Sequence, residues 1–179
     1  METVAKSTRW ALDTTHSELT FKVKHMMITN VKGIFKNFSV EANGDDIFSS
    51  RLSVNIDPSS IDTNNTDRDN HLRSPDFFDV EQHKEITFQS TSFKQKDGDE
   101  YELKGVLTIK NISKEISLKV EFGGVNKDPW GNEKAGFSLE GKINRKDFGL
   151  NWNAALETGG VLVSEEVKFS GEVQFLKQA

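Results

Sequence analysis

The sequence has no cysteine, only one tyrosine and only three prolines among its 179 residues. The lack of cysteine excludes disulfides, thiolate metal sites, iron–sulfur clusters and cysteine nucleophiles, and it leaves the redox compartment open. No apolar run approaches the roughly 18 residues that a membrane-spanning helix needs. The chain therefore has the features of neither a disulfide-rich protein nor a helical membrane protein.

A strong charge of one sign is also missing, because 23 Lys and Arg stand against 28 Asp and Glu, for a net charge of −5. Such a chain has no overall attraction for a polyanion, so no nucleic-acid partner is expected. The first ten residues contain no apolar stretch of about 7 residues, which predicts that a secretory leader is absent. We therefore expect a cytoplasmic protein, or a periplasmic one if a leader has been removed.

Two-residue alternation of apolar and polar side chains dominates the chain from about Trp10 onward, and this pattern is typical of half-buried strands. The clearest case is the stretch 116–122, where Ile, Leu, Val and Phe alternate with Ser, Lys and Glu. Polar connections such as Asp97-Gly98-Asp99 and Asn111-Ile112-Ser113 predict hairpins between neighbouring strands. So many one-sided strands need a second sheet or closure on themselves. We predict an all-β fold, an antiparallel barrel of about eight strands in a single domain over residues 1–179, with residues 1–9 as a flexible N-terminal segment.

Three segments interrupt the alternation, and we place them at the rim of the barrel. In His25–Gly33, Met27 and Val31 are four residues apart, which is compatible with one helical turn facing inward. The long connection 57–85 contains a short helix at residues 64–73 with an Asn cap, followed by a turn with two adjacent Phe. The third segment, residues 144–164, suggests a ligand lid or a structural corner.

Residues for catalysis are sparse. The four histidines show neither an i,i+4 pair nor a His-x-His spacing, so no metal ion is expected, and no nucleophile elbow, phosphate-binding loop or dinucleotide fingerprint occurs, so no cofactor is expected. The chain is instead rich in phenylalanine, with 13 Phe against 3 Trp. These rings fit a packed core, and they fit equally a barrel cavity that encloses one apolar ligand.

Several longer motifs add to this interpretation. They are His16-Ser17 with His25-Met26-Met27, Gly33–Phe38, Ser60–Thr63 with Arg68–Val80, Gly105–Lys110, Lys127–Gly131, Arg145–Gly149 and Leu156–Ser164. Through them the chain resembles, from about Trp10 to its C-terminus, the YceI-like family of lipid- and polyisoprenoid-binding proteins. The resemblance implies an extended, lipocalin-like barrel that binds a polyprenyl pyrophosphate, an isoprenoid quinone or a fatty-acid derivative without catalysis. It also implies a possible homodimer.

Strand parity and the rim segments together nominate the residues that line such a cavity. The candidates are Phe21, Val23, Met27, Phe38, Phe77, Phe88, Leu107, Phe122, Phe137, Trp152 and Phe169. Arg68, His71 and Arg73 are the candidates for contact with a polar head group. Two alternatives stay open at this point: an enzyme that acts on a lipid-like substrate with His71 and Asp69 as its acid–base pair, and an interaction module with a filled interior.

Overall fold

The computed structural model describes residues 10–26, 28–43, 51–153 and 163–177. Within these ranges it contains eleven strands, one α-helix and three short 3-10 turns. The strands are β1 (Trp10–Leu12), β2 (Glu18–His25), β3 (Thr29–Phe35), β4 (Phe38–Asn43), β5 (Arg51–Ile56), β6 (Ile61–Asp62), β7 (Ile86–Asp97), β8 (Glu100–Ile109), β9 (Ile112–Lys127), β10 (Glu133–Asn144) and β11 (Glu166–Lys177). The helical elements are η1 (Thr14–His16), η2 (Pro58–Ser60), α1 (Thr66–Arg73) and η3 (Arg145–Phe148).

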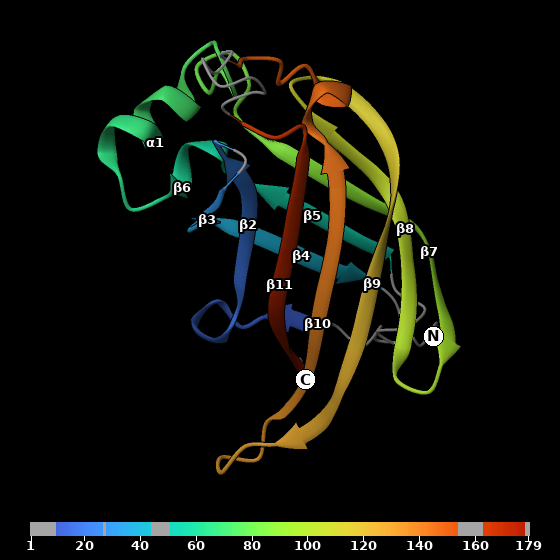
Figure 1. The fold of residues 1–179 in the computed structure, drawn as a ribbon. Coiled ribbons are helices and arrows are strands. Elements are labelled where there is room, and N and C mark those ends of the chain that lie inside the picture. The colour runs from blue at the N-terminus through green and yellow to red at the C-terminus, as the bar shows by residue number, and fades with distance from the viewer. Residues whose placement is uncertain (1–9, 27, 44–50, 154–162, 178–179) are drawn as a thin grey trace, which may run out of the picture.

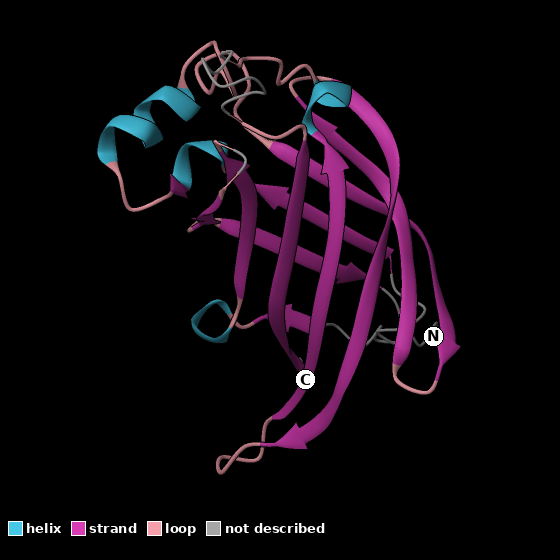
Figure 2. Ribbon diagram, viewed as in Figure 1, coloured by secondary structure: helices cyan, strands magenta, loops and turns pink. Residues whose placement is uncertain are grey.

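The strands form one closed antiparallel barrel (Figures 1 and 2), in which β7 to β11 pair in chain order and β11 pairs back with β1 and β2. The three N-terminal members of the barrel are each broken into two strands. The turn η1 separates β1 from β2, residues 36–37 separate β3 from β4, and η2 separates β5 from β6. When each broken pair is taken as one member, the barrel has eight members in up-and-down order, as the alternation pattern predicts.

One predicted element is wrong. The segment His25–Gly33 does not form a helical turn, because β3 begins at Thr29 and pairs with β2 from His25 to Thr20. Val31 is inward-facing on this strand opposite Val23, whereas Met27 lies outside the described residues.

The predicted helix in the long connection is confirmed as α1. The side chain of Asn65 accepts a hydrogen bond of 3.0 Å from the backbone N–H of Arg68, which caps the first turn. Figure 1 shows α1 at one end of the barrel, beside the end of β2 and β3. None of the helices in the described ranges is both long and apolar enough to cross a membrane.

The opposite end of the barrel is filled by an aromatic floor, which we define as Phe93, Tyr101, Phe122, Phe137 and Phe175. The ring centroids of Phe93 and Tyr101 are 5.1 Å apart, and those of Phe122 and Phe137 are 5.2 Å apart. Phe137 also contacts Phe175 at 6.0 Å. Aromatic pairs at these spacings are favourable beyond the area that they bury, so this end of the barrel is a packed core.

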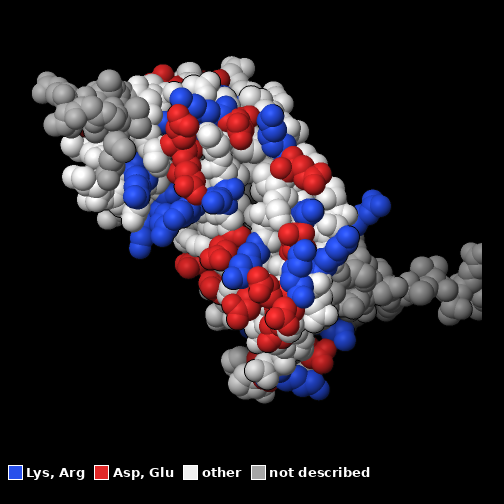
Figure 3. Space-filling view, turned by 45° about the vertical axis from the view of Figure 1, so that its right-hand side comes forward, with Lys and Arg blue, Asp and Glu red and all other residues white. Residues whose placement is uncertain are grey.

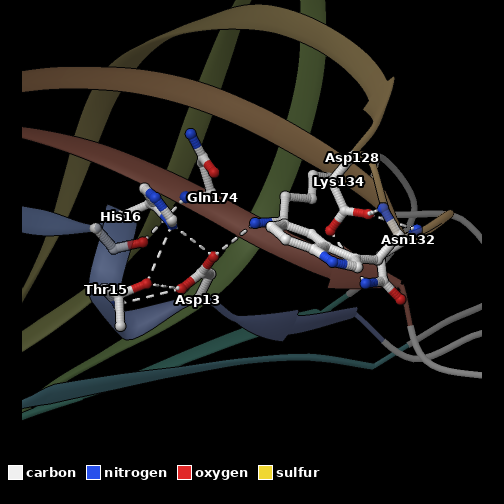
Figure 4. A network of polar contacts seen from close by, with 9 residues as sticks. Asp13, Thr15, His16, Asp128, Asn132, Lys134 and Gln174 are labelled. Atoms are coloured by element: carbon white, nitrogen blue, oxygen red, sulfur yellow. Dashed lines mark hydrogen bonds and ion pairs between the residues drawn. The ribbon is translucent and has the colours of Figure 1, made fainter.

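A polar cluster beside the floor fixes the break between β1 and β2 (Figure 4). One carboxylate oxygen of Asp13 accepts hydrogen bonds from the hydroxyl of Thr15 at 2.7 Å and from its backbone N–H at 3.1 Å. The other lies 2.8 Å from Nδ1 of His16 and 3.1 Å from Nζ of Lys134. The Thr15 hydroxyl foremost, and then the His16 ring, hold the pKa of Asp13 well below its ordinary value of 3.8. The cluster thereby ties η1 to β10.

We expect Asp13→Asn to lower the free energy of unfolding by about 1–2 kcal/mol at neutral pH, because the charged acceptor is lost. Since the folded-state pKa of Asp13 is below its unfolded value, the stabilisation is complete above about pH 4 and falls as the pH drops toward the folded-state value. Urea unfolding of both proteins at pH 7 and pH 3 measures this. The difference between wild type and variant should be smaller at pH 3, and an equal difference at both pH values would contradict the assignment.

Candidate functional site

A cavity of about 620 Å³ lies inside the barrel, between the aromatic floor and α1. Most of its wall consists of inward-facing aliphatic and aromatic side chains from β2 to β5 and from β7 to β11. The polar side chains on its wall come mostly from the end that carries α1 and η3. The cavity therefore has an apolar body and a polar mouth, an arrangement that suits an amphiphilic ligand.

The interior of this part of the barrel is hollow rather than packed. Val23, Val54 and Phe169 line the cavity, yet each is only half-buried. Inward-facing side chains of a filled core are almost fully buried, as Ala135 on β10 is, at 0% exposure. Such partial exposure on the inner side of a closed barrel means that the walls do not touch across the centre.

Two glycines give the cavity its width on one side. Gly33 pairs with Phe21, Phe21 pairs with Phe169, and Phe169 pairs with Gly141, so the four residues form one inward-facing row across β3, β2, β11 and β10. The Phe21 ring lies over Gly33, and the Phe169 ring lies over Gly141, where an added Cβ would stand 2.7 Å from Cζ of Phe169. Because glycine has no side chain, each ring can lie against the wall.

At the mouth, Thr63 joins α1 to the end of β6. The buried Asp69 accepts hydrogen bonds from the backbone N–H and the hydroxyl of Thr63, at 2.8 and 2.5 Å. Arg68 donates from Nε to the same hydroxyl at 2.8 Å and from Nη2 to the Thr63 carbonyl at 2.7 Å. Two of the five N–H donors of Arg68 are thus used locally, while its side chain lines the cavity. This network holds the positive charge of Arg68 at the mouth of the cavity.

His71 stands beside Arg68 in an aromatic corner. Its ring lies 4.7 Å from the ring of Trp152 and 5.1 Å from that of Phe77, both edge to face. Its Nε2 lies 2.8 Å from Oδ2 of Asp76. The acid–base pair of His71 with Asp69 that the enzyme alternative needs is therefore not formed, because Asp69 bonds to Thr63 and His71 meets Asp76 instead.

Arg145 at the start of η3 is the site residue that sequence analysis missed. It is 2% exposed and lines the cavity. Its guanidinium donates to the carbonyls of Leu150 at 2.5 Å, Trp152 at 2.8 Å, Ser164 at 2.8 Å and Val163 at 3.3 Å. Burial lowers the pKa of Arg145 from its ordinary value. One side chain thus connects the two backbone segments 150–152 and 163–164 at the mouth.

The structure places most of the predicted residues on the cavity wall. Those that line it are Phe21, Val23, Phe38, Phe77, Phe88, Leu107, Phe137, Trp152, Phe169, Arg68 and His71. Phe122 is not among the lining residues; its ring packs in the floor against that of Phe137, its register partner on β10. Arg73 is not among them either, because it donates to the carbonyls of Ser59 and Ile61 outside the cavity. Neither residue lines this cavity, their contact with a ligand stays a prediction, and Met27 lies outside the described residues.

Within the described ranges, no three His, Asp or Glu side chains lie close enough together to hold a metal ion.

Sequence comparison assigns the chain to a known family. The chain matches the YceI-like domain over residues 10–175. The chain belongs to the YceI-like family. A UPF0312 protein of Staphylococcus epidermidis is 46% identical over 171 residues, which are 94% of this chain and 97% of the relative.

Solved structures show the same fold. The YceI protein of Campylobacter jejuni is 36% identical and superposes with a TM-score of 0.75, over 87% of this chain and 90% of that one. A polyisoprenoid-binding domain from Saccharophagus degradans, implicated in plant cell wall breakdown, has a TM-score of 0.72 at 14% identity, over 94% of this chain and 98% of that one. The latter identity is low, so that likeness concerns the fold.

Proposed function

We propose that the protein binds an isoprenoid-type lipid in the barrel cavity and carries or sequesters it without converting it. The observation that supports this most is the hollow, half-buried inner wall above the aromatic floor. A chain of about 15 buried CH₂ groups would gain roughly 12 kcal/mol before ordering costs, enough for useful affinity. The polyisoprenoid-binding domain with the same fold supports this ligand class.

The ligand's polar head belongs at the mouth in this proposal. Arg68 and His71 lie there on α1, whereas the opposite end of the cavity consists of aromatic rings. A pyrophosphate head would accept charge-assisted hydrogen bonds from the donors of Arg68 that Thr63 does not use. A neutral head such as a quinone or an alcohol would gain much less from the same cation.

The Arg68 contact predicts a preference that depends on the head group. We expect Arg68→Gln to weaken binding of geranylgeranyl pyrophosphate by about 10- to 100-fold, the effect of one charge-assisted hydrogen bond. Binding of geranylgeraniol, which has the same chain without the pyrophosphate, should stay within a factor of about two. Titration calorimetry with both compounds tests this. An equal loss for both would mean that Arg68 shapes the mouth and does not contact the head.

The ligand class itself is tested by native mass spectrometry of freshly purified protein, followed by organic extraction. A stoichiometric isoprenoid or fatty-acyl species that leaves on denaturation is expected. A protein that is ligand-free after purification and stays so after incubation with geranylgeranyl pyrophosphate, geranylgeraniol and palmitate would contradict the proposal. Chemically altered lipid after incubation would instead favour an enzyme.

A further inference from the structure

The outer face of the barrel carries four lysines directly opposite one another on adjacent strands. The register pairs Lys32 with Lys22, Lys22 with Lys168, and Lys168 with Lys142 across β3, β2, β11 and β10. All four side chains are exposed. We call them the lysine row. Like charges directly opposite one another on neighbouring strands are destabilising, so the lysine row lowers the stability of the barrel.

Most of this positive charge is not neutralised. Lys142 meets Glu166 at 3.7 Å. Among the described residues, no carboxylate oxygen lies within 4.0 Å of the ammonium groups of Lys22, Lys32 and Lys168.

The carboxylates on the same face are mostly paired with other lysines. Asp62 meets Lys36 at 2.9 Å, and Glu100 meets Lys119 at 3.8 Å. Glu140, on β10 beside the row, faces Lys119 in the register. The row is therefore a local excess of positive charge on a protein whose net charge is −5.

The lysine row lines a groove of about 1430 Å³ on the outside of the barrel. Figure 3 shows blue side chains gathered to one side of the outer face, next to mixed blue and red side chains. The row also runs along the wall of the lipid cavity, because Lys22 and Lys168 follow Phe21 and precede Phe169 on their strands, and these two rings point inward. The charged face and the cavity thus share the same stretch of wall.

We propose that the lysine row docks the protein on the surface of a bilayer that contains anionic phospholipids. The choice of a bilayer as the partner rests on the proposed function, since a long-chain isoprenoid resides in membranes and its carrier must meet one. Charge complementarity supports it: each lysine close to an anionic surface strengthens binding by about fivefold, and salt weakens this effect.

The test is sedimentation with vesicles of phosphatidylcholine, with and without phosphatidylglycerol, at low and high salt. Wild type should bind the vesicles that contain phosphatidylglycerol and should leave them at high salt. The double variant Lys22→Gln/Lys168→Gln should bind about 25-fold more weakly. The matched control is Lys114→Gln/Lys127→Gln, which removes the same charge from exposed lysines outside the row, and it should bind as wild type does.

Three results would overturn the proposal: equal binding to both kinds of vesicle, full binding by the row variant, or binding to a DNA duplex in place of the anionic vesicles. Thermal unfolding checks the fold, because removing like charges should raise the midpoint of the row variant. Geranylgeraniol binding in detergent, without vesicles, separates this proposal from the proposed function. The row variant should bind geranylgeraniol as wild type does, so loss of vesicle binding with retained geranylgeraniol binding supports the role of the lysine row. Failure of wild type to bind geranylgeraniol would contradict the proposed function and leave the vesicle result to be judged separately.

Discussion

Replacing Arg145 with methionine is expected to lower the free energy of unfolding by about 3–5 kcal/mol, since several buried carbonyls lose a charged donor at once, and this is the largest effect of any single substitution proposed for this chain. Arg145 is 2% exposed, and its guanidinium donates to four backbone carbonyls, those of Leu150, Trp152, Val163 and Ser164. Methionine fills a similar space but donates no hydrogen bond, so the carbonyls of Leu150, Trp152 and Ser164 lose their donor in a place that water reaches poorly. The carbonyl of Val163 keeps its hydrogen bond of 2.8 Å from the side-chain amide of Asn153.

Urea unfolding followed by circular dichroism measures the change, with two comparisons. Arg145→Lys keeps the charge but not the planar fork of donors, so it should recover only part of the stability. Arg73→Met also removes an arginine that donates to two carbonyls, but at a half-buried position, and should cost clearly less. If Arg145→Met and Arg73→Met are equally mild, the mouth does not depend on Arg145.

Filling the cavity should abolish lipid binding while leaving the barrel folded. Val23 on β2 and Val54 on β5 both face the cavity and are half-buried. We expect the double variant Val23→Trp/Val54→Trp to lose bound lipid, because the two indoles occupy the space that the ligand needs. Overpacking a filled core typically costs about 1–3 kcal/mol per site, whereas in a hollow barrel the cost should stay below about 1 kcal/mol in total.

Geranylgeraniol binding and urea unfolding are measured together on this variant. Lys24→Trp is the matched control, since Lys24 follows Val23 on the same strand but points outward and is exposed. This control should bind the alcohol as wild type does. A folded cavity-filled variant that still binds would place the ligand elsewhere, and a strongly destabilised one would show that the interior is packed.

Much of the fold was predictable from the sequence because most strands of the barrel wall show two-residue alternation of apolar and polar side chains. The strand over 116–122 is correct in both position and facing, since Leu118 and Val120 are buried while Lys119 is exposed. The cap of α1 was also predictable, because Asn65 is followed by a short polar segment with acidic residues in its first turn. Both features depend only on short stretches of the chain, so they can be recognised without knowledge of the tertiary structure.

β3 was missed for a reason that lies in its neighbours. Its inward-facing position Gly33 has no side chain because the Phe21 ring covers it, and its outward-facing position Ile34 is apolar and 36% exposed. The alternation on β3 is therefore inverted at that point. Sequence parity also does not show which inward-facing rings border the cavity: Phe122 has the parity of a lining residue, but its ring packs against that of Phe137 on the neighbouring strand and does not line the cavity. Arg145 carries no local signal at all, since its partners are carbonyls that only the folded loop brings together.

The row of Gly33, Phe21, Phe169 and Gly141 has one more consequence, which concerns the shape of the guest molecule. Gly33 and Gly141 carry only a hydrogen atom where other residues carry a Cβ atom. The missing side chains set the width of the cavity at this level of the barrel. A prenyl chain carries a methyl branch at regular intervals, and a straight acyl chain does not. A methyl group at Gly141 would push the Phe169 ring toward the axis of the barrel. The width of a ligand that fits the cavity therefore depends on these two glycine positions more than on the many apolar side chains around them.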